Sequence, residues 1–378
     1  PLEINFDEMG KMANLTSFME QLSEQHNVRF ASYAGLHGWS VENSELFWTS
    51  LSEFAGVKAV DWGEIVLQDG DSMPGASWFP NARLNFAENL LPKRDNSEVL
   101  VFYGEDQVIR RLSWSELYDQ VSLMAQAMRA AGVSVGDRVA AYLPNMPEAI
   151  IGMLAASSMG ALWSSCSPDF GVQGVLDRFG QIEPKLLFCA DGYFYNGKSH
   201  DCLEKIAQIQ EQLPSLETVV VVPYAGKNKD LSTIVGAVEL SEFIDGFSPR
   251  DIAFEALPFN HPLYIMYSSG TTGAPKCIVH GAGGTLLQHL KEHLLHCDVK
   301  EGERIFYFTT CGWMMWNWLV SALACRATVL LYDGSPFYPN GNVLFDLADK
   351  EQMTVFGTSA KFIDTIKKTG LKPQENHS

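Results

Sequence analysis

The sequence predicts an α/β fold with two successive runs of βαβ units. From residue 98 to residue 222, short apolar segments alternate with longer segments of helical periodicity, and the alternation resumes at residue 263. Strands that alternate with helices of about 10–15 residues are typical of a parallel sheet covered by helices. At 378 residues the chain also exceeds the ~250–300 residues at which a single core stops growing, which favours more than one subdomain.

Composition excludes some classes of protein and partner. An apolar fraction of 46% is typical of a globular chain and not of a disordered one. The net charge of −18 argues against a nucleic-acid partner, because binding to a phosphate backbone needs a positively charged face. The seven cysteines form an odd set without a C-x-x-C pair, which is typical of reduced thiols in the cytosol.

Residues 1–95 form a predicted N-terminal extension. This region lacks the strand–helix alternation and is rich in aromatic residues, among them Trp39, Trp48, Trp62 and Trp78. Short helices are expected over residues 42–54 and 85–91.

Residues 96–258 are predicted to form the first α/β subdomain. A hairpin of strands 99–102 and 109–112 leads to a helix over 113–131, which has Ser113 as N-cap, Glu116 three residues later and Gly132 as its stop. The remaining predicted strands are 139–143, 161–165, 186–189 and 218–222, and the remaining helices are 147–159, 172–182 and 200–213. The polar, irregular segment 224–258 indicates a boundary.

Residues 259–378 are predicted to form the second α/β subdomain. Its predicted strands are 263–267, 277–280, 305–308, 328–332 and 354–357, and its helices are 285–296, 314–324, 342–350 and 360–368.

Two uncharged spans, 149–168 and 305–325, reach the ~20 residues that a transmembrane helix needs. Gly160 divides the first span and the segment 309–312 divides the second. Buried α/β elements are therefore favoured over the alternative of a membrane-inserted enzyme, and we expect no membrane insertion.

The loop between strands 263–267 and 277–280 indicates phosphate binding. It contains Ser268, Ser269, Gly270, Thr271, Thr272, Gly273, Ala274, Pro275 and Lys276. Glycine lets backbone N–H groups approach an anion closely, hydroxyl groups add donors and can ligate a metal ion on the phosphate, and Lys276 adds a compact positive charge. A Walker loop would have its lysine directly after the second glycine, whereas Ala274 and Pro275 intervene here. A plain Ser/Gly-rich linker is also disfavoured, because apolar strands flank the loop.

The order of residues in this loop resembles the phosphate loop of the acyl-adenylate-forming ligases, the superfamily of acyl-CoA synthetases and luciferases. Segments 112–117 and 160–171 resemble two further motifs of that superfamily. A narrower resemblance, to the acetoacetyl-CoA synthetase family, rests on segments 39–42, 83–91, 195–198, 272–277, 283–286, 312–318 and 332–336. Together these motifs extend the resemblance over essentially all 378 residues.

The resemblance implies a fold and a reaction. The fold would be two stacked βαβ-type subdomains of the large N-terminal domain of such ligases, incomplete and preceded by the extension. The reaction would be ATP-dependent ligation of acetoacetate to coenzyme A through an acetoacetyl-adenylate, with Mg²⁺ bridging the phosphates. The resemblance also implies a cytosolic enzyme that directs acetoacetate into lipid synthesis.

The resemblance implies roles for individual residues. Residues 268–273, Pro275 and Lys276 would hold the ATP phosphates, and Thr271 or Thr272 would approach Mg²⁺. Trp313, Met314 and Met315 would form the acyl pocket, with a plain helix core as the alternative. Arg178 would bind the 3′-phosphate of coenzyme A, or else form a surface ion pair with Asp177 or Glu183. Gly357, Thr358 and Ser359 would line the nucleotide cleft at a strand end.

A helical histidine series, His289, His293 and His296, offers a zinc site as one interpretation. The zincin motif would need Glu directly after the first histidine, where Leu290 stands, so a solvated helix face is favoured instead.

The chain departs from the family pattern at its C-terminal end. The Tyr-Gly-x-Thr-Glu-type motif, the hinge and the C-terminal lid domain with its adenylation lysine are absent from the 378 residues. We therefore expect a chain that binds its substrates without completing catalysis, with the catalytic residues outside it and the oligomeric state open. The alternatives are an acetyl-CoA or other short-chain acyl-CoA synthetase, and a non-catalytic nucleotide-binding or interaction protein.

Overall fold

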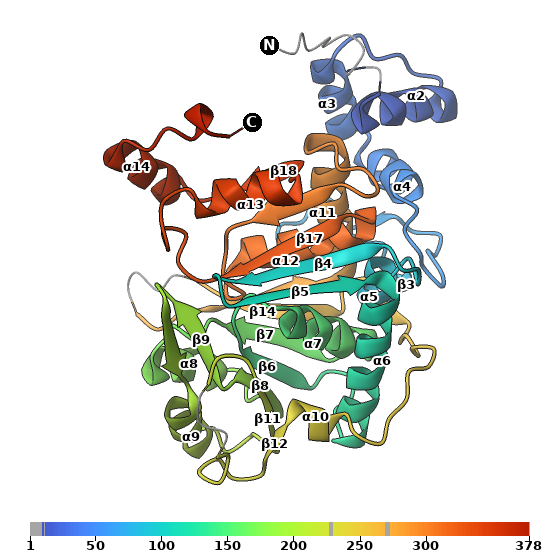
Figure 1. Ribbon diagram of the computed structural model, residues 1–378. Helices are drawn as coiled ribbons and strands as arrows, with labels where there is room; N and C mark the ends of the chain where they lie inside the picture. Colours follow the sequence, from blue (N-terminus) through green and yellow to red (C-terminus); the bar gives the residue numbers. More distant parts are fainter. Residues whose placement is uncertain (1–9, 11, 227–229, 269–272, 378) are drawn as a thin grey trace.

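The computed structural model describes residues 10, 12–226, 230–268 and 273–377. Two mainly parallel sheets lie one above the other with helices between and outside them (Figure 1), which confirms the predicted α/β class.

The larger sheet has seven strands in the order β12-β11-β8-β6-β7-β14-β15. All neighbours are parallel except β14 and β15, which form an antiparallel pair. The strands are β6 (Arg138–Tyr142), β7 (Leu162–Cys166), β8 (Leu186–Ala190), β11 (Thr218–Val222), β12 (Ala237–Glu239), β14 (Pro262–Tyr267) and β15 (Cys277–Gly281).

The smaller sheet has five strands in the order β18-β16-β17-β4-β5. Here the antiparallel pair is β4 with β5, and the other neighbours are parallel. The strands are β4 (Glu98–Gly104), β5 (Val108–Ser113), β16 (Arg304–Tyr307), β17 (Thr328–Asp333) and β18 (Val355–Gly357).

Strand membership does not follow the boundary predicted at residues 258 and 259. The later strands β14 and β15 join the larger sheet, and the early hairpin β4–β5 joins the smaller one. Pairing between strands is a non-local choice, so a boundary drawn from composition along the chain does not predict it. Each sheet therefore contains strands from both halves of the chain.

Helices form three layers. Between the sheets lie α5 (Phe86–Leu90), α6 (Trp114–Ala130), α7 (Pro147–Ser158), α11 (Ala282–Lys291) and α12 (Met314–Ser321), whose buried side chains share one core with both sheets. On the outer face of the larger sheet lie α8 (Val172–Phe179) and α9 (Leu203–Glu211). On the outer face of the smaller sheet lie α13 (Val343–Glu351) and α14 (Ala360–Thr369). Successive side chains of β6 point to opposite faces of the larger sheet. Val139 and Ala141 pack in the core between the sheets, and Ala140 and Tyr142 pack in the core under α8 and α9.

The N-terminal region is a small helical unit over residues 14–54. Helix α4 (Ser44–Phe54) overlaps the predicted helix, whereas α2 (Asn14–His26) and α3 (Tyr33–Glu42) were not predicted. Phe18, Leu22 and Leu51 form its buried core together with Leu295. Short strands follow at β1 (Leu67–Gln68), β2 (Ser77–Trp78), β3 (Arg83–Leu84) and, later in the chain, β13 (Leu257–Pro258).

Local signals set several element ends. Ser113 and Glu116 form the predicted capping box of α6. The predicted helix over 200–213 begins later, because β9 (Gly192–Tyr195) and β10 (Lys198–Asp201) form a hairpin around Asn196 and Gly197. Segment 224–258, predicted to be irregular, contains β12 and the short helix α10 (Leu240–Phe243).

The two uncharged spans form separate buried elements, as predicted. Span 149–168 divides into α7 and β7, and span 305–325 divides into β16, α12 and the 3₁₀-helix η2 (Ala322–Cys325). Among the described helices, none has the length and apolar character needed to cross a bilayer.

Candidate active site

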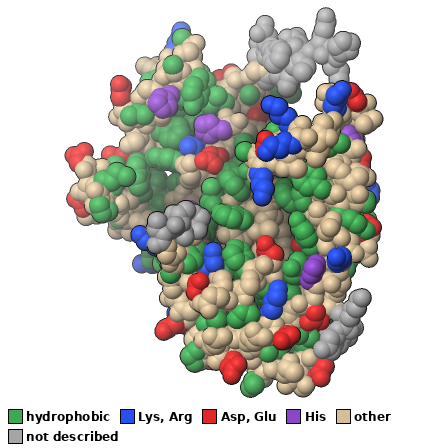
Figure 2. Space-filling view, turned by 90° about the vertical axis from the view of Figure 1, so that its left-hand side faces the viewer, with side chains coloured by type: hydrophobic (Ala, Val, Ile, Leu, Met, Phe, Trp, Pro, Cys, Tyr) green, Lys and Arg blue, Asp and Glu red, His purple; other side chains and the backbone are tan. Residues whose placement is uncertain are grey.

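The candidate site lies where the carboxyl ends of both sets of parallel strands meet. After β6 the chain enters α7 on the inner face of the larger sheet, whereas after β8 it leads to α9 on the outer face. Ligands of open α/β sheets bind at such a topological switch point. A cavity of about 330 Å³ opens here. Figure 2 looks onto this side of the molecule and shows its surface hollowed between upper and lower parts.

Hydrogen bonds join the strand ends of the two sheets around the cavity. Buried Asn145, which follows β6, donates from Nδ2 to the Thr309 carbonyl over 3.3 Å and accepts at Oδ1 from the Trp316 indole N–H over 2.9 Å. The Ser165 hydroxyl donates to the Cys311 carbonyl over 2.6 Å. The loop after β16 is thus held against β6 and β7 at the edge of the cavity.

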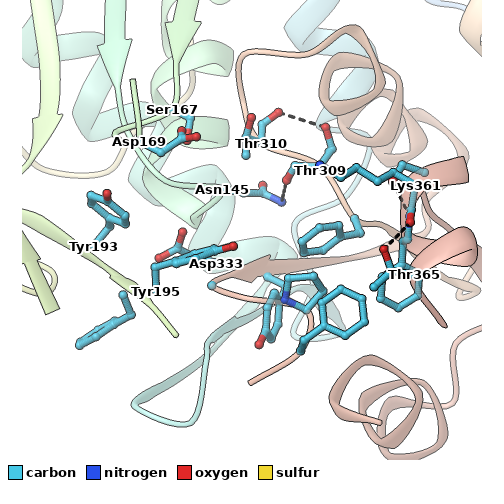
Figure 3. Close-up of a pocket in the computed structure, with 18 residues that line it drawn as sticks. Asn145, Ser167, Asp169, Tyr193, Tyr195, Thr309, Thr310, Asp333, Lys361 and Thr365 are labelled. Atoms are coloured by element: carbon cyan, nitrogen blue, oxygen red, sulfur yellow. Dashed lines mark hydrogen bonds between the residues drawn. The ribbon is translucent and has the colours of Figure 1, made fainter. Parts of the chain in front are cut away.

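The cavity has aromatic walls and a few polar groups. In Figure 3, Tyr193 and Tyr195 approach from one side and Lys361 and Thr365 from the other, with Asp333 between them. The remaining lining residues are Asn145, Ser167, Asp169, Phe194, Phe308, Thr309, Thr310, Tyr332, Gly334, Pro336, Phe337, Ser359 and Phe362. This mixture suits an organic molecule with several oxygen or nitrogen atoms.

Asp333 is the most perturbed acid of the cavity. Burial raises the pKa of Asp333 to about 7, although hydrogen bonds from the Tyr224 hydroxyl, at 2.9 Å, and the Phe194 N–H favour its charged form. The hydroxyl of Thr310 is buried with no hydrogen-bond partner among the described residues. Buried polar atoms are usually paired, so we expect a ligand in the cavity to form a hydrogen bond with the Thr310 hydroxyl.

The phosphate loop joins β14 to β15, and the structure describes its two ends. The Ser268 N–H donates to the Lys276 carbonyl over 3.0 Å, and the Lys276 N–H donates to the Ser268 hydroxyl over 2.9 Å, which closes the base of the loop. Pro275 is buried, and its carbonyl accepts from the Gln181 side chain over 2.8 Å. Gly273 and Lys276 are exposed. Ser269, Gly270, Thr271 and Thr272, including the two proposed metal ligands, lie outside the described residues.

A small pocket brings three separately predicted groups together. It is lined by Ser268, Arg178 and Trp313, along with Ser165, Cys166, Phe170, Tyr267 and Gly312. The Arg178 guanidinium lies 4.5 Å from the Phe170 ring centroid and donates to the Gly174 carbonyl over 2.7 Å. The alternative of an ion pair with Asp177 or Glu183 finds no support in the described part of the chain. Arg178 thus places a positive charge beside the start of the phosphate loop.

The Trp/Met stripe is mostly at the surface. Trp313 caps α12 and is 56% exposed, and Met314 is 44% exposed, so the alternative of a plain helix core is wrong for both. Met315 is partly buried and packs against the main core. Large exposed apolar side chains beside a polar pocket fit a surface that a ligand covers.

The strand end 357–359 lies on the far side of the larger cavity. Ser359 lines that cavity and caps α14 by accepting from the Phe362 N–H over 3.2 Å. Gly357 and Thr358 are not among the described residues that line it. Gly357 leaves room for a ring, because an added Cβ would lie 2.1 Å from Cδ2 of Tyr307.

The histidine series does not form the predicted solvated face. His289 and His293 are buried, and they bond the Ser321 hydroxyl at 2.7 Å and the Trp318 carbonyl at 2.8 Å. Burial lowers the pKa of His289 to about 3 and that of His293 to about 4. Only His296 of the three is exposed. The series changes face because the α-helix passes into the π-helix η1 (Glu292–His296).

Sequence reasoning did not assign Asn145, Asp169, Tyr193, Asp333 or Lys361 to the site. Asn145 lies in the loop after β6 and Asp333 is the last residue of β17, and a position at the carboxyl end of a parallel strand is a signal that could have found both. Tyr193 lies in the unpredicted hairpin, and Lys361 lies on a helix that carries no motif.

Parallel sheets with a Ser/Gly/Thr loop at a strand end fit the class of α/β proteins that bind nucleotides. Residues 88–378 match the model of the AMP-binding enzyme family, and residues 33–90 match that of the acetyl-coenzyme A synthetase N-terminus. The chain belongs to the AMP-binding enzyme family.

Individual relatives confirm the narrower resemblance found in the motifs. The chain is 55% identical to acetoacetyl-coenzyme A synthetase of Rhizobium meliloti over 378 residues and 46% identical to acetoacetyl-CoA synthetase of Gallus gallus over 373 residues. These alignments cover 100% and 97% of this chain and 58% and 56% of the relatives. The solved acetoacetyl-CoA synthetase of Streptomyces lividans matches with a TM-score of 0.91 at 40% identity, covering 97% of this chain and 56% of that one. The chain thus spans a little more than half the length of the relatives it matches.

Proposed function

We propose that the chain supplies the ATP- and acid-binding part of an acetoacetate–CoA ligase. In the first step the acetoacetate carboxylate attacks the α-phosphorus of ATP, which gives acetoacetyl-AMP and releases pyrophosphate. In the second step the thiol of coenzyme A attacks the acyl carbon and AMP leaves. The product, acetoacetyl-CoA, would serve lipid synthesis in the cytosol.

The observation that carries the proposal is the meeting of Ser268, Arg178 and Trp313 in one pocket at the carboxyl ends of the strands. Substitution at phosphorus depends mainly on positioning and on neutralising charge. Lys276 would supply positive charge at the ATP phosphates in a chain whose net charge is −18, and Arg178 would bind the 3′-phosphate of coenzyme A. The loop hydroxyls would hold the β- and γ-phosphates. Thr271 or Thr272 would help to hold Mg²⁺, which would neutralise negative charge on the phosphates.

The proposal that the acid substrate is acetoacetate rests on the apolar surface beside the phosphate loop. Trp313 offers a flat ring beside the first residue of the phosphate loop, and the neighbouring Met314 offers an exposed, adaptable apolar side chain. The longer acetoacetate chain would cover more of this surface than acetate would. An acetyl-CoA or other short-chain synthetase is the alternative, and a binding protein without turnover is a second one.

The test is a calorimetric titration of the chain with MgATP in the presence of acetoacetate, acetate or no acid. We expect one nucleotide site whose affinity rises several-fold with acetoacetate, because the two substrates occupy adjoining parts of one cleft, and changes little with acetate. Equal effects of the two acids would favour the broader short-chain specificity. A folded chain that binds no nucleotide would contradict the proposed function.

A further inference from the structure

One buried carboxylate joins the smaller sheet to the β9–β10 hairpin at the wall of the cavity. Glu105 follows β4 of the smaller sheet and is only 5% exposed. Its Oε1 accepts from the backbone N–H of Asn196 over 2.7 Å and from that of Ser335 over 2.9 Å, and its Oε2 accepts from the Gly197 N–H over 2.9 Å. Its own N–H donates to the Asp333 carbonyl over 2.9 Å.

The three donors come from two segments that line the cavity. Asn196 and Gly197 form the turn of the β9–β10 hairpin, which carries Tyr193 and Tyr195 into the cavity. Their φ angles of +54° and +73° turn both N–H groups toward one point, as in the tight hairpin turns that favour Asn-Gly. Ser335 belongs to the turn after β17, which carries Asp333.

The turn after β17 is shaped around this carboxylate. Gly334 has a φ of +134°, and a Cβ added there would lie 2.1 Å from Cγ of Glu105. Only a residue without a side chain lets the turn pass Glu105 closely enough for the Ser335 N–H to reach it. Both the hairpin and the turn therefore depend on the same side chain for their position.

We propose that Glu105 is a positioning residue that holds the β9–β10 hairpin and the 333–335 turn together as one wall of the substrate cavity. Ionised carboxylates make stronger hydrogen bonds to N–H groups than neutral acceptors do, so an amide at this position holds the wall less firmly. The identity of the ligand rests on the proposed function, whereas the role of Glu105 in holding the wall does not.

The test compares Glu105→Gln with Glu351→Gln. Glu351, at the end of α13, is also a buried glutamate, but it accepts from Arg111, Arg304 and Tyr103 beside the amino end of β16, away from the cavity. Both variants remove one buried carboxylate, so both are expected to lower the melting temperature. Only Glu105→Gln is expected to speed amide hydrogen exchange in hairpin residues 192–201, by tenfold or more. It alone is also expected to weaken MgATP binding in the presence of acetoacetate by at least fivefold.

Unchanged hairpin exchange in Glu105→Gln, or equal changes in both variants, would overturn the proposal. So would unchanged ligand affinity with a loosened hairpin, since the hairpin would then not be a wall of the ligand site. If Glu105→Gln does not fold, Gly334→Ala displaces the same side chain and is expected to give the same exchange pattern. A wild-type chain that binds no nucleotide would contradict the proposed function, while the exchange results would still decide the role of Glu105.

Discussion

Glu105 and Asp333, two acidic side chains near the 333–335 turn, differ in the hydrogen bonds that stabilise their negative charge. Glu105 accepts three backbone N–H groups, whereas the partners of Asp333 are the Tyr224 hydroxyl and the Phe194 N–H. Glu105 and Asp169 also repel the charge on Asp333, and burial raises its pKa to about 7. The ionised form of Asp333 is therefore disfavoured in the folded chain.

Replacing Asp333 with Asn is expected to stabilise the ligand-free chain at pH 8. Because the folded pKa lies above the ordinary value near 3.8, stability is lost as the pH rises from about 4 through about 7, and Asn avoids this loss. A gain of roughly 1–3 kcal/mol in the free energy of unfolding is expected at pH 8, and a gain near zero at pH 4. Urea unfolding at both pH values measures it, and an equal gain at both would show that ionisation of Asp333 is not the cause.

The sequence alone identified those candidate site residues that belong to a local motif. The loop 268–276 and the Trp313–Met315 stripe could be selected from the sequence, because motif and spacing are visible along the chain. The state of Asp333 could not, since its partner Tyr224 is 109 residues away.

At the scale of elements, the helix α11 and the π-helix η1 form a buried seam between the N-terminal unit and the main core. His289 and His293 lie on this seam, and burial lowers the pKa of each well below 6.5, to about 3 and about 4. Both histidines are therefore neutral in the folded chain and take up protons on unfolding below pH 6.5.

Acid is therefore expected to destabilise the chain through this seam. Stability is complete above the unfolded pKa near 6.5 and falls as the pH drops below it, by about 1.4 kcal/mol per pH unit for each histidine until the folded pKa is reached. At pH 5.5 the two together cost about 2–3 kcal/mol relative to pH 7.5. Denaturant unfolding of His289→Gln should show about half of this acid sensitivity, with the exposed His296→Gln as control. An acid response identical to wild type in His289→Gln would rule the seam out as the cause.

Elements with caps or strong periodicity were predicted to within a few residues, as α6 and β4–β5 show. The β9–β10 hairpin was missed although Asn196-Gly197 is a strong turn signal, because the strands beside it are only four residues each. The π-helix was missed because no local sequence pattern marks it; within it, His293 packs on Trp318 with ring centroids 4.2 Å apart.

At the scale of the whole molecule, two sheets exchange strands and meet at their carboxyl ends. The α/β class followed from the alternation of strands and helices, but the exchange of β4–β5 and β14–β15 between the sheets did not. This exchange places the phosphate loop, which follows β14, next to the loop after β16 and to Trp313. The candidate site is thus a product of the topology as much as of its motifs.

The most direct test of the account is a MgATP titration of the chain against Lys276→Ala. We expect one saturable site in the wild type and a loss of affinity of roughly 10- to 100-fold in the variant, because a charge-assisted bond to phosphate is removed. The exposed Lys367→Ala, on the outer helix α14, should bind as the wild type does. Equal affinity of Lys276→Ala and wild type, with both folded, would contradict the assignment of this loop to the phosphates of ATP.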